Sequence, residues 1–257
     1  MSDLSAKLSG RLALVTGSSK GIGRAIALAF ASSGADVVVN YHRSRQAGED
    51  VAKSACAGGG RACAIQADVS REEEVGGLFG RIAKEFGRSP DILVNNAGSQ
   101  IELSAIQEMP VTLWNDVLAL NLTSAFLCAR AAIPGMKQRK WGRIINVTSI
   151  SGRSGGGPGG AHYAAAKAAL ISLTRSLAKE LAPFSITANA IAPGVILTEM
   201  HERFNTPEGL DKLKALIPLG RHGLPEDCAG AAVFLASDSA SYITGAEIAV
   251  NGGMRMD

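Results

Sequence analysis

Short runs of apolar residues alternate with longer amphipathic segments along almost the whole chain. Runs that are apolar throughout and separated by helical patterns are typical of a parallel sheet covered on both faces. Such runs predict seven strands, at 12–16, 36–40, 62–67, 91–95, 143–148, 186–191 and 247–250.

The segments between these strands have helical spacing. Crossovers between parallel strands are right-handed, so the helices must cover both faces of the sheet. We therefore predict an α/β fold, with one doubly wound domain of the Rossmann type over residues 1–257 and a helical insert at about 196–218. Helices are predicted at 21–33, 44–57, 71–86, 112–138 and 225–236, with another around position 163.

Composition narrows the class of protein. Apolar residues make up 46% of the 257 positions, and the formal charge of +3 comes from scattered basic residues, so we expect no nucleic-acid partner. We expect no membrane span, because the apolar segment 117–136 contains Asn121 and Arg130. Residues 1–11 lack the apolar core of a signal peptide, and a cytoplasmic location is predicted.

Four cysteines fall inside predicted helices or a strand and lack CxxC spacing. We predict buried free thiols, with no metal site and no disulfide. The cysteines are Cys56, Cys63, Cys128 and Cys228.

Tyr163 and Lys167 are four residues apart, and the three alanines between them favour a helix. Both side chains should therefore lie on one helix face. A cation beside a phenol favours the phenolate, so we expect Lys167 to lower the pKa of Tyr163 and make it a usable proton donor. The alternative is an ordinary surface pair. Ser149 follows a predicted strand, at the sheet edge where open α/β folds place ligands.

A glycine-rich turn, from Thr16 to Gly23, follows the first strand and opens the first helix. Glycines there let the backbone approach a diphosphate, whose charge is met by the helix N-terminus. The spacing is G-x-x-x-G-x-G, which differs from the usual dinucleotide fingerprint G-x-G-x-x-G.

Taken together and in this order, the motifs resemble those of the short-chain dehydrogenase/reductase family over nearly the whole chain. Besides the glycine turn and the Ser149, Tyr163 and Lys167 set, the matching pieces are Asp68-Val69, Asn95-Asn96-Ala97-Gly98, Asn121 and Pro193-Gly194 with Thr198. The resemblance implies a nicotinamide cofactor that is bound by Gly17, Ser19, Lys20, Gly21, Ile22, Gly23, Asn40, Arg43, Ser44, Asp68, Val69, Asn95, Ala97, Gly98, Tyr163, Lys167, Pro193, Gly194, Val195 and Thr198.

The resemblance also implies a hydride transfer between the nicotinamide and a carbonyl or secondary alcohol. Ser149 and Tyr163 would stabilise the charge that grows on the carbonyl oxygen, Tyr163 would deliver the proton, and Lys167 would hold the ribose hydroxyls. The resemblance implies that Asn121 completes the catalytic set, because the matching residue in the family supports a water chain that resupplies the proton. Its alternative role is to tie its helix to nearby backbone, because a buried amide needs partners.

NADP(H) is predicted over NAD(H), because the second strand ends without the carboxylate that binds the adenosine ribose in NAD enzymes. Arg43 and Lys20 would clamp the 2′-phosphate from two sides, with Ser44 donating a further hydrogen bond. The alternative is that Arg43 and Arg45 form a solvated helix start.

Within the family, the phrases 234–237 and 250–254 are most similar to 3-oxoacyl-acyl-carrier-protein reductases. Two regions that usually carry basic residues for the acidic carrier hold Pro134 and Phe184 instead. We predict reduction of a ketone such as a 3-oxoacyl thioester, with carrier-bound substrates handled poorly compared with small or free ketones. The alternatives are an NAD-dependent alcohol or sugar dehydrogenase working oxidatively and, more remotely, a non-catalytic nucleotide-sensing protein.

Three further expectations concern the surroundings of the site. The insert at about 196–218 is predicted to form a substrate lid, in which His201 is a surface residue rather than a catalyst. The glycine-rich loop 152–160 would be a mobile wall of the substrate pocket, or else a solvent loop without contacts. Two helices, at 112–138 and at 163–181, are apolar on more than one face and need cover beyond one sheet. The family resemblance implies that they pair across a two-fold axis in a homotetramer.

Overall fold

The sheet has seven parallel strands in the order β3-β2-β1-β4-β5-β6-β7. The computed structural model describes residues 7–57 and 59–256, so the first six residues, part of the segment lacking a signal-peptide core, lie outside the description. Chain order runs outward from β1 on both sides, which confirms the predicted doubly wound α/β fold. The strands are β1 (Leu12–Val15), β2 (Asp36–Tyr41), β3 (Ala62–Gln66), β4 (Ile92–Asn95), β5 (Gly142–Val147), β6 (Ile186–Pro193) and β7 (Glu247–Val250).

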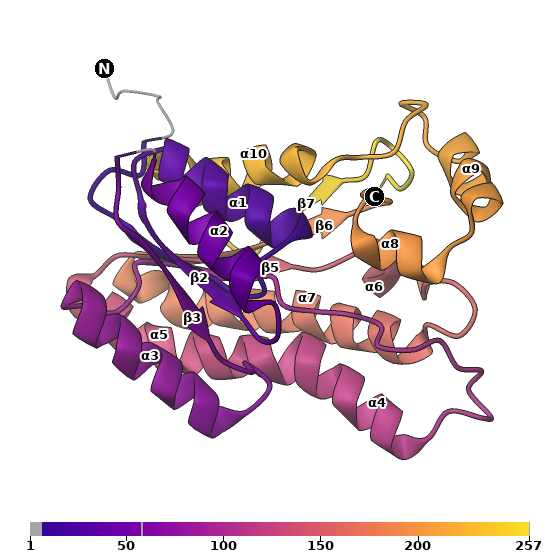
Figure 1. Ribbon diagram of the computed structural model, residues 1–257, viewed down its shortest axis with the longest axis horizontal. Helices are drawn as coiled ribbons and strands as arrows, with labels where there is room; N and C mark the ends of the chain where they lie inside the picture. Colours follow the sequence, from indigo (N-terminus) through magenta and orange to yellow (C-terminus); the bar gives the residue numbers. More distant parts are fainter. Residues whose placement is uncertain (1–6, 58, 257) are drawn as a thin grey trace.

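Helices form a layer on each side of the sheet (Figure 1). One layer holds α1 (Gly21–Ser32), α2 (Arg45–Cys56) and α10 (Pro225–Ala236). The other holds α3 (Glu72–Phe86), α4 (Val111–Leu118), α5 (Ser124–Arg139) and α7 (Ala161–Leu181). Shorter helices lie in the connections: α6 (Ser151–Ser154), α8 (Glu199–Phe204) and α9 (Pro207–Ala215), with 3-10 turns at Ala182–Phe184 and Asp238–Ala240.

Strand β1 explains why the strands are apolar throughout. Ala13 and Val15 pack into the core beneath α1 and α10, whereas Leu12 and Leu14 pack into the core on the other face. All four are completely buried. Because successive side chains point to opposite faces, a strand between two helix layers must be apolar at every position.

The carboxyl ends of the central strands meet at one edge of the sheet. Val15 is in register with Val94 of β4, and Asn95 with Asn146 of β5. Backbone bonds continue this alignment beyond the strands, from Thr16 N to the Val94 carbonyl (3.0 Å) and from Thr148 N to the Ile191 carbonyl (2.8 Å). The residues that follow β1, β4, β5 and β6 therefore converge there.

The predicted single helix at 112–138 is interrupted. A π-helical turn, Ala119–Thr123, separates α4 from α5 and is centred on Asn121. Turns of this kind inside α-helices are frequent at functional sites, because the wider ring of backbone atoms displaces one residue from the regular pattern.

Two predictions from composition need correction. The continuous helical stretch Val111–Arg139 is, within the described residues, long and apolar enough by length and composition to cross a membrane, although it contains Asn121 and Arg130. Core helices pass the same test, and this stretch buries Leu127, Cys128 and Ala132 against the sheet. All four cysteines are free, but Cys56 is exposed and Cys63 is half-buried, because they lie on an outer helix and an edge strand.

Candidate active site

The glycine turn is held against the loop that follows β4. Gly17 and Gly21 have φ values of 60° and 56°, which favour glycine. A Cβ atom on Gly17 would lie 2.9 Å from the Ala97 Cα. The amide of Asn96 donates to the Thr16 and Gly17 carbonyls at 2.9 and 3.1 Å. The backbone of this turn is therefore fixed, and it carries no side chain at Gly17 and Gly21.

Helix α1 begins directly after the turn, at Gly21, and has no acidic residue in its first turn. Its N-cap, Lys20, makes no side-chain bond to the helix backbone. The first N–H groups of α1 and the positive end of its dipole are thus available to an anion. This arrangement fits a dinucleotide diphosphate, with Ser19, Ile22 and Gly23 in the same segment.

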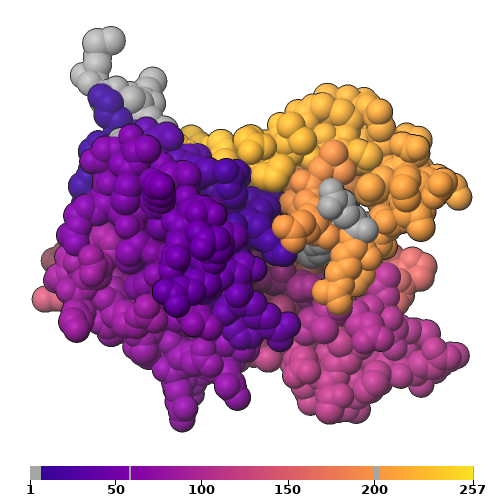
Figure 2. Space-filling view, viewed as in Figure 1, coloured from indigo at the N-terminus to yellow at the C-terminus, as the bar shows by residue number. Residues whose placement is uncertain are grey.

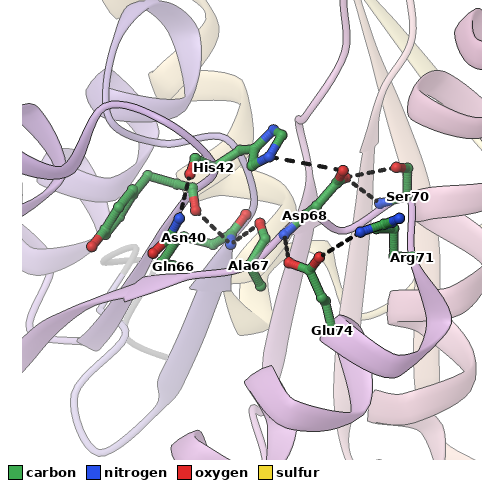
Figure 3. A network of polar contacts seen from close by, with 9 residues as sticks. Asn40, His42, Gln66, Ala67, Asp68, Ser70, Arg71 and Glu74 are labelled. Atoms are coloured by element: carbon green, nitrogen blue, oxygen red, sulfur yellow. Dashed lines mark hydrogen bonds and ion pairs between the residues drawn. The ribbon is translucent and has the colours of Figure 1, made fainter.

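Asn40, a predicted cofactor residue, is almost completely buried and serves the turn. Its Oδ1 accepts a hydrogen bond from Gly17 N (3.1 Å), and its Nδ2 donates to the Ala67 carbonyl (3.1 Å). Figure 3 shows this amide between β2 and the end of β3. Asn40 therefore supports the glycine turn through backbone contacts, and its amide is already occupied.

Asp68 lies beside Asn40 in a network of polar contacts (Figure 3). Burial would raise the pKa of its carboxyl group, but hydrogen bonds from the hydroxyl and N–H of Ser70 (2.6 and 3.0 Å) outweigh it and lower the pKa. His42 approaches the same carboxylate at 3.9 Å. An ionised acceptor thus stands beside the buried Val69, at the end predicted to hold the adenine.

Arg43 and Ser44 are exposed in the turn between β2 and α2. Arg45 pairs with Glu49 of its own helix (2.8 Å), whereas no hydrogen bond or ion pair involves the Arg43 side chain among the described residues. Lys20 points elsewhere and pairs with Glu199 of α8. This arrangement does not place Lys20 and Arg43 together as the two sides of a clamp.

The residues after β4 divide into structural and accessible groups. Asn95 donates to Asn146 Oδ1 (2.8 Å) and is buried, so its side chain belongs to the sheet. Ala97 N donates a hydrogen bond to the Thr16 hydroxyl oxygen (3.0 Å). Gly98 is exposed and has open backbone at the edge of the site.

The loop after β6 lies on the other side of the glycine turn. The Pro193 carbonyl accepts from Ile150 N (3.1 Å), and Gly194 N donates to the Val250 carbonyl (3.0 Å). Val195 is buried. A Cβ on Gly21 would touch the Thr198 methyl group at 3.4 Å, so this loop lies directly over the glycine turn.

Tyr163 lies on the first turn of α7 and is almost completely buried, as is Ser149 at the end of β5. Burial raises the pKa of the Tyr163 phenol to about 12, and a hydrogen bond with the Ser149 hydroxyl opposes this rise. Ser149 and Tyr163 thus come together as predicted, in a setting that keeps the phenol protonated.

Lys167 is also buried, one helical turn further along α7. Its Nζ donates to the Val147 carbonyl (2.8 Å) and lies 5.5 Å from the centre of the Tyr163 ring. Burial lowers the pKa of this ammonium group to about 8. The prediction that Lys167 lowers the pKa of Tyr163 is therefore wrong for this structure: the pair shares a face, but desolvation governs both groups.

Asn121 ties the π-helical turn to the loop after β4. Its Nδ2 donates to the carbonyls of Ser99 (2.7 Å) and Val117 (2.9 Å), and its Oδ1 accepts from Ser99 N (3.2 Å). A Cβ on Gly98 would lie 2.5 Å from Asn121 Oδ1 and 3.1 Å from Lys167 Nζ. These contacts agree with the alternative role of Asn121, in which it ties its helix to nearby backbone. They also place Gly98, Asn121 and Lys167 next to one another.

A cavity of about 350 Å³ lies between the loop after β4 and the predicted lid. Its walls are Ile101, Glu102 and Leu103 on one side and the segment 203–206 on the other. Figure 2 shows a hollow between the orange lid region and the magenta segment. The loop 152–160 is not free of contacts, because a Cβ on Gly159 would lie 3.1 Å from Leu103 Cβ.

Three residues that hold the site together were given no role from the sequence. Asn96 fixes the glycine turn, Asn146 holds Asn95, and His162 contacts the loop after β4. Asn96 had a visible signal, the pair of asparagines at the end of a strand. Asn146 and the Glu102 contact of His162 involve partners that are distant in sequence, and no local pattern indicates them.

A bare glycine turn after the first strand, a free helix N-terminus, and a buried Ser, Tyr and Lys at the same sheet edge define a dinucleotide-dependent oxidoreductase. Comparison with known proteins gives the same class. The family model described as "Enoyl-(Acyl carrier protein) reductase" matches residues 17–255.

Individual relatives cover almost the whole chain. The 3-oxoacyl-[acyl-carrier-protein] reductase of Synechocystis sp. is 46% identical over 97% of this chain and 98% of its own. A Beutenbergia cavernae protein assigned as an NAD(P)-dependent gluconate 5-dehydrogenase, solved with NADP at low occupancy, has a TM-score of 0.91 and 39% identity over 97% of this chain and 98% of its own.

A 7α-hydroxysteroid dehydrogenase solved with NADH and 7-oxo glycochenodeoxycholic acid has a TM-score of 0.92 and 35% identity, covering 96% of this chain and 95% of its own. The chain belongs to the short-chain dehydrogenase/reductase family, and it is an oxidoreductase.

Proposed function

We propose that this protein is an NADP(H)-dependent ketoreductase that reduces a ketone such as a 3-oxoacyl thioester. The observation that carries the proposal is the convergence of Ser149, Tyr163, Lys167 and Asn121 beside the glycine turn. The names of the reductase relatives support the substrate class. An NAD-dependent alcohol or sugar dehydrogenase is the second candidate, supported by the gluconate dehydrogenase relative.

The chain's own residues have distinct tasks in this reaction. The nicotinamide, when bound, supplies or accepts the hydride. Tyr163 keeps a proton on its phenol oxygen until the carbonyl oxygen becomes basic, and Ser149 donates a hydrogen bond to that oxygen. Lys167 contributes a positive charge beneath the phenol, and Asn121 fixes the backbone on which Gly98 and Ser99 lie.

NADP(H) is the proposed cofactor, with NAD(H) as the weaker choice. The end of β2 presents the neutral, occupied Asn40 rather than a carboxylate that would repel a 2′-phosphate. Arg43 and Ser44 are exposed at the start of α2 and able to meet a phosphate. The NADP in one relative supports this choice, whereas the NADH in another supports the alternative.

We further propose a homotetramer with a small-molecule substrate and a cytoplasmic location. Exposed apolar side chains on the α4–α5 stretch and near the C-terminus support assembly: Val111, Phe126, Tyr242 and Met256. Light scattering at micromolar concentration tests this part, and a stable monomer would contradict it.

The central experiment measures reduction of a 3-oxoacyl thiol ester with NADPH and with NADH, followed by the absorbance of the reduced nicotinamide. We expect turnover with NADPH, and a rate lower by on the order of 100-fold or more in Tyr163→Phe, because the variant has no transferable proton. Unchanged turnover in this variant contradicts the assignment. Alcohol or sugar oxidation with NAD⁺ that exceeds ketone reduction favours the second candidate, and reduction of an enoyl thioester instead would indicate a different reaction.

A further inference from the structure

His162 connects two parts of the site that are far apart in the sequence. It directly precedes Tyr163 in the first turn of α7 and is completely buried. Its Nδ1 lies 2.7 Å from Tyr163 N, and its Nε2 lies 2.9 Å from the carbonyl oxygen of Glu102.

The two contacts together require one form of the imidazole ring. A backbone N–H only donates, so Nδ1 must be without a proton; a carbonyl only accepts, so Nε2 must carry one. The ring is therefore neutral, and both of its polar atoms are used.

The first contact supports the backbone of the predicted proton donor. Helix α7 begins at Ala161, and its first regular helical bond runs from Ala164 N to the Gly160 carbonyl. The Tyr163 N–H precedes that bond and has no backbone carbonyl partner within the helix, so it needs a partner of another kind. His162 supplies this partner in a fully buried position.

The second contact holds the wall of the cavity. Ile101, Glu102 and Leu103 line the 350 Å³ cavity opposite the lid, and Ile101 has a φ of 60°, which is costly for a β-branched residue. A strained segment keeps its conformation only where neighbours fix it. Besides His162, other segments of the chain do so: Arg203 donates to the Ile101 carbonyl (3.1 Å), and Ser104 N donates to the Gly159 carbonyl (3.1 Å).

The Arg203 and Gly159 tethers come from the lid and from the glycine-rich loop, whereas His162 belongs to the helix that carries Tyr163 and Lys167. We infer that His162 is a positioning residue that fixes the cavity wall at Glu102 relative to the backbone of Tyr163, and that this wall faces the substrate. This inference rests on the proposed ketoreductase function, in which Tyr163 delivers the proton.

Substitutions at position 162 separate the two contacts. In His162→Asn, the amide oxygen occupies the place of Nδ1 and still accepts from Tyr163 N, but the side chain is too short for Glu102. In His162→Gln, the amide nitrogen occupies the place of Nε2 and still donates to Glu102, but no acceptor faces Tyr163 N. His162→Phe keeps a ring and removes both contacts.

The measurements are kcat and KM for the ketone, together with amide hydrogen exchange of the peptide 99–104. We expect His162→Asn to raise KM on the order of 10-fold and increase exchange of the wall, with little change in kcat, as befits the loss of one buried hydrogen bond. His162→Gln should instead lower kcat on the order of 10-fold with near-normal exchange, and His162→Phe should show both effects.

Arg88→Gln is the matched control for general destabilisation, because Arg88 pairs with Asp91 (3.1 Å) at the opposite end of the sheet. It should lower the melting temperature without changing KM or exchange of 99–104. Equal losses of kcat in all three His162 variants, with unaltered exchange of the wall, would overturn the inference. If the wild-type protein reduces no ketone, the proposed function fails, but unchanged wall exchange in His162→Asn still decides against the tether.

Discussion

Lys167 lies one helical turn beyond Tyr163, yet its ammonium group donates to the Val147 carbonyl at 2.8 Å rather than to the phenol. The lysine thereby joins α7 to the end of β5, two residues before Ser149. Because Tyr163 and Lys167 are both buried, the pKa of each depends mainly on desolvation rather than on the other group.

The lowered pKa of Lys167 predicts that cofactor binding weakens above a certain pH. A lysine with a pKa of about 8 is charged below that pH and neutral above it, so its contribution to binding is present at neutral pH and lost in mild alkali. We expect kcat/KM for NADPH, which reports the free enzyme, to fall as pH rises through about 8.

Lys167→Arg provides the control, because a guanidinium group stays charged throughout this range. The variant should be less active, since the longer planar group does not fit the same space, but its profile should be flat around pH 8. A wild-type profile that is flat up to pH 10 would show that another group sets the charge at this site.

Asn121→Ala should both destabilise the protein and reduce its activity. The change leaves Ser99 N, the Ser99 carbonyl and the Val117 carbonyl without the amide. Unpaired buried groups cost about 1–3 kcal/mol each, partly offset where water enters, so the free energy of unfolding should fall by about 2 kcal/mol. Chemical denaturation and ketone turnover measure the two effects.

Ser124→Ala is the matched control at the same turn, since it removes one local bond from Ser124 Oγ to the Leu120 carbonyl (2.6 Å) and leaves the Ser99 contacts in place. Turnover should be almost unchanged there. If Ser124→Ala reduces turnover as much as Asn121→Ala, the general integrity of the π-helical turn matters more than the bonds to Ser99.

Cofactor preference should depend on Arg43. A charge-assisted contact with the 2′-phosphate contributes about 1.5–3 kcal/mol, so Arg43→Ala should weaken NADPH binding roughly 10- to 100-fold and leave NADH almost unchanged. Arg45→Ala is the control, because Arg45 is already paired with Glu49 at 2.8 Å. Dissociation constants from nicotinamide fluorescence test both; tighter binding of NADH than NADPH by the wild type would contradict the NADP assignment.

The strands could be predicted closely because burial on both faces leaves a continuous apolar signal. Leu12 and Leu14 face one helix layer and Ala13 and Val15 the other, so no position in the strand tolerates a polar side chain. The π-helical turn has no such signal. Only the polar Asn121 within an apolar helix indicated that something unusual occurs there.

Side-chain partners were the part that could not be predicted. The spacing of Tyr163 and Lys167 correctly places both on one face, but it contains no information on the depth of burial that raises one pKa and lowers the other. Lys20 finds its partner Glu199 at a sequence separation of 179 residues. The side-chain amide of Asn40 is hydrogen-bonded to the glycine turn, through Gly17 N. It is therefore not free to bind a ribose.

The last prediction is that a carrier-bound substrate will have little advantage over a small thiol ester. The usual basic docking regions hold Pro134 and Phe184, and the nearby cations are already engaged: Lys137 lies 4.6 Å from the Phe184 ring and 3.6 Å from Glu180. Arg130 pairs with Glu72 in the same way. Cations that are already paired with acidic side chains attract an acidic carrier only weakly. Such attraction mainly sets the association rate.

Values of kcat/KM for one 3-oxoacyl group on carrier protein and on a short thiol mimic decide the matter, and we expect them to agree within about 10-fold. Lys137→Glu should leave this ratio unchanged, because the lysine already compensates Glu180. A strong preference for the carrier form that falls at high salt and disappears in Lys137→Glu would show that the carrier displaces Glu180 and docks on this lysine. The same preference without any effect of salt would indicate contacts with the acyl arm inside the cavity rather than with the carrier surface.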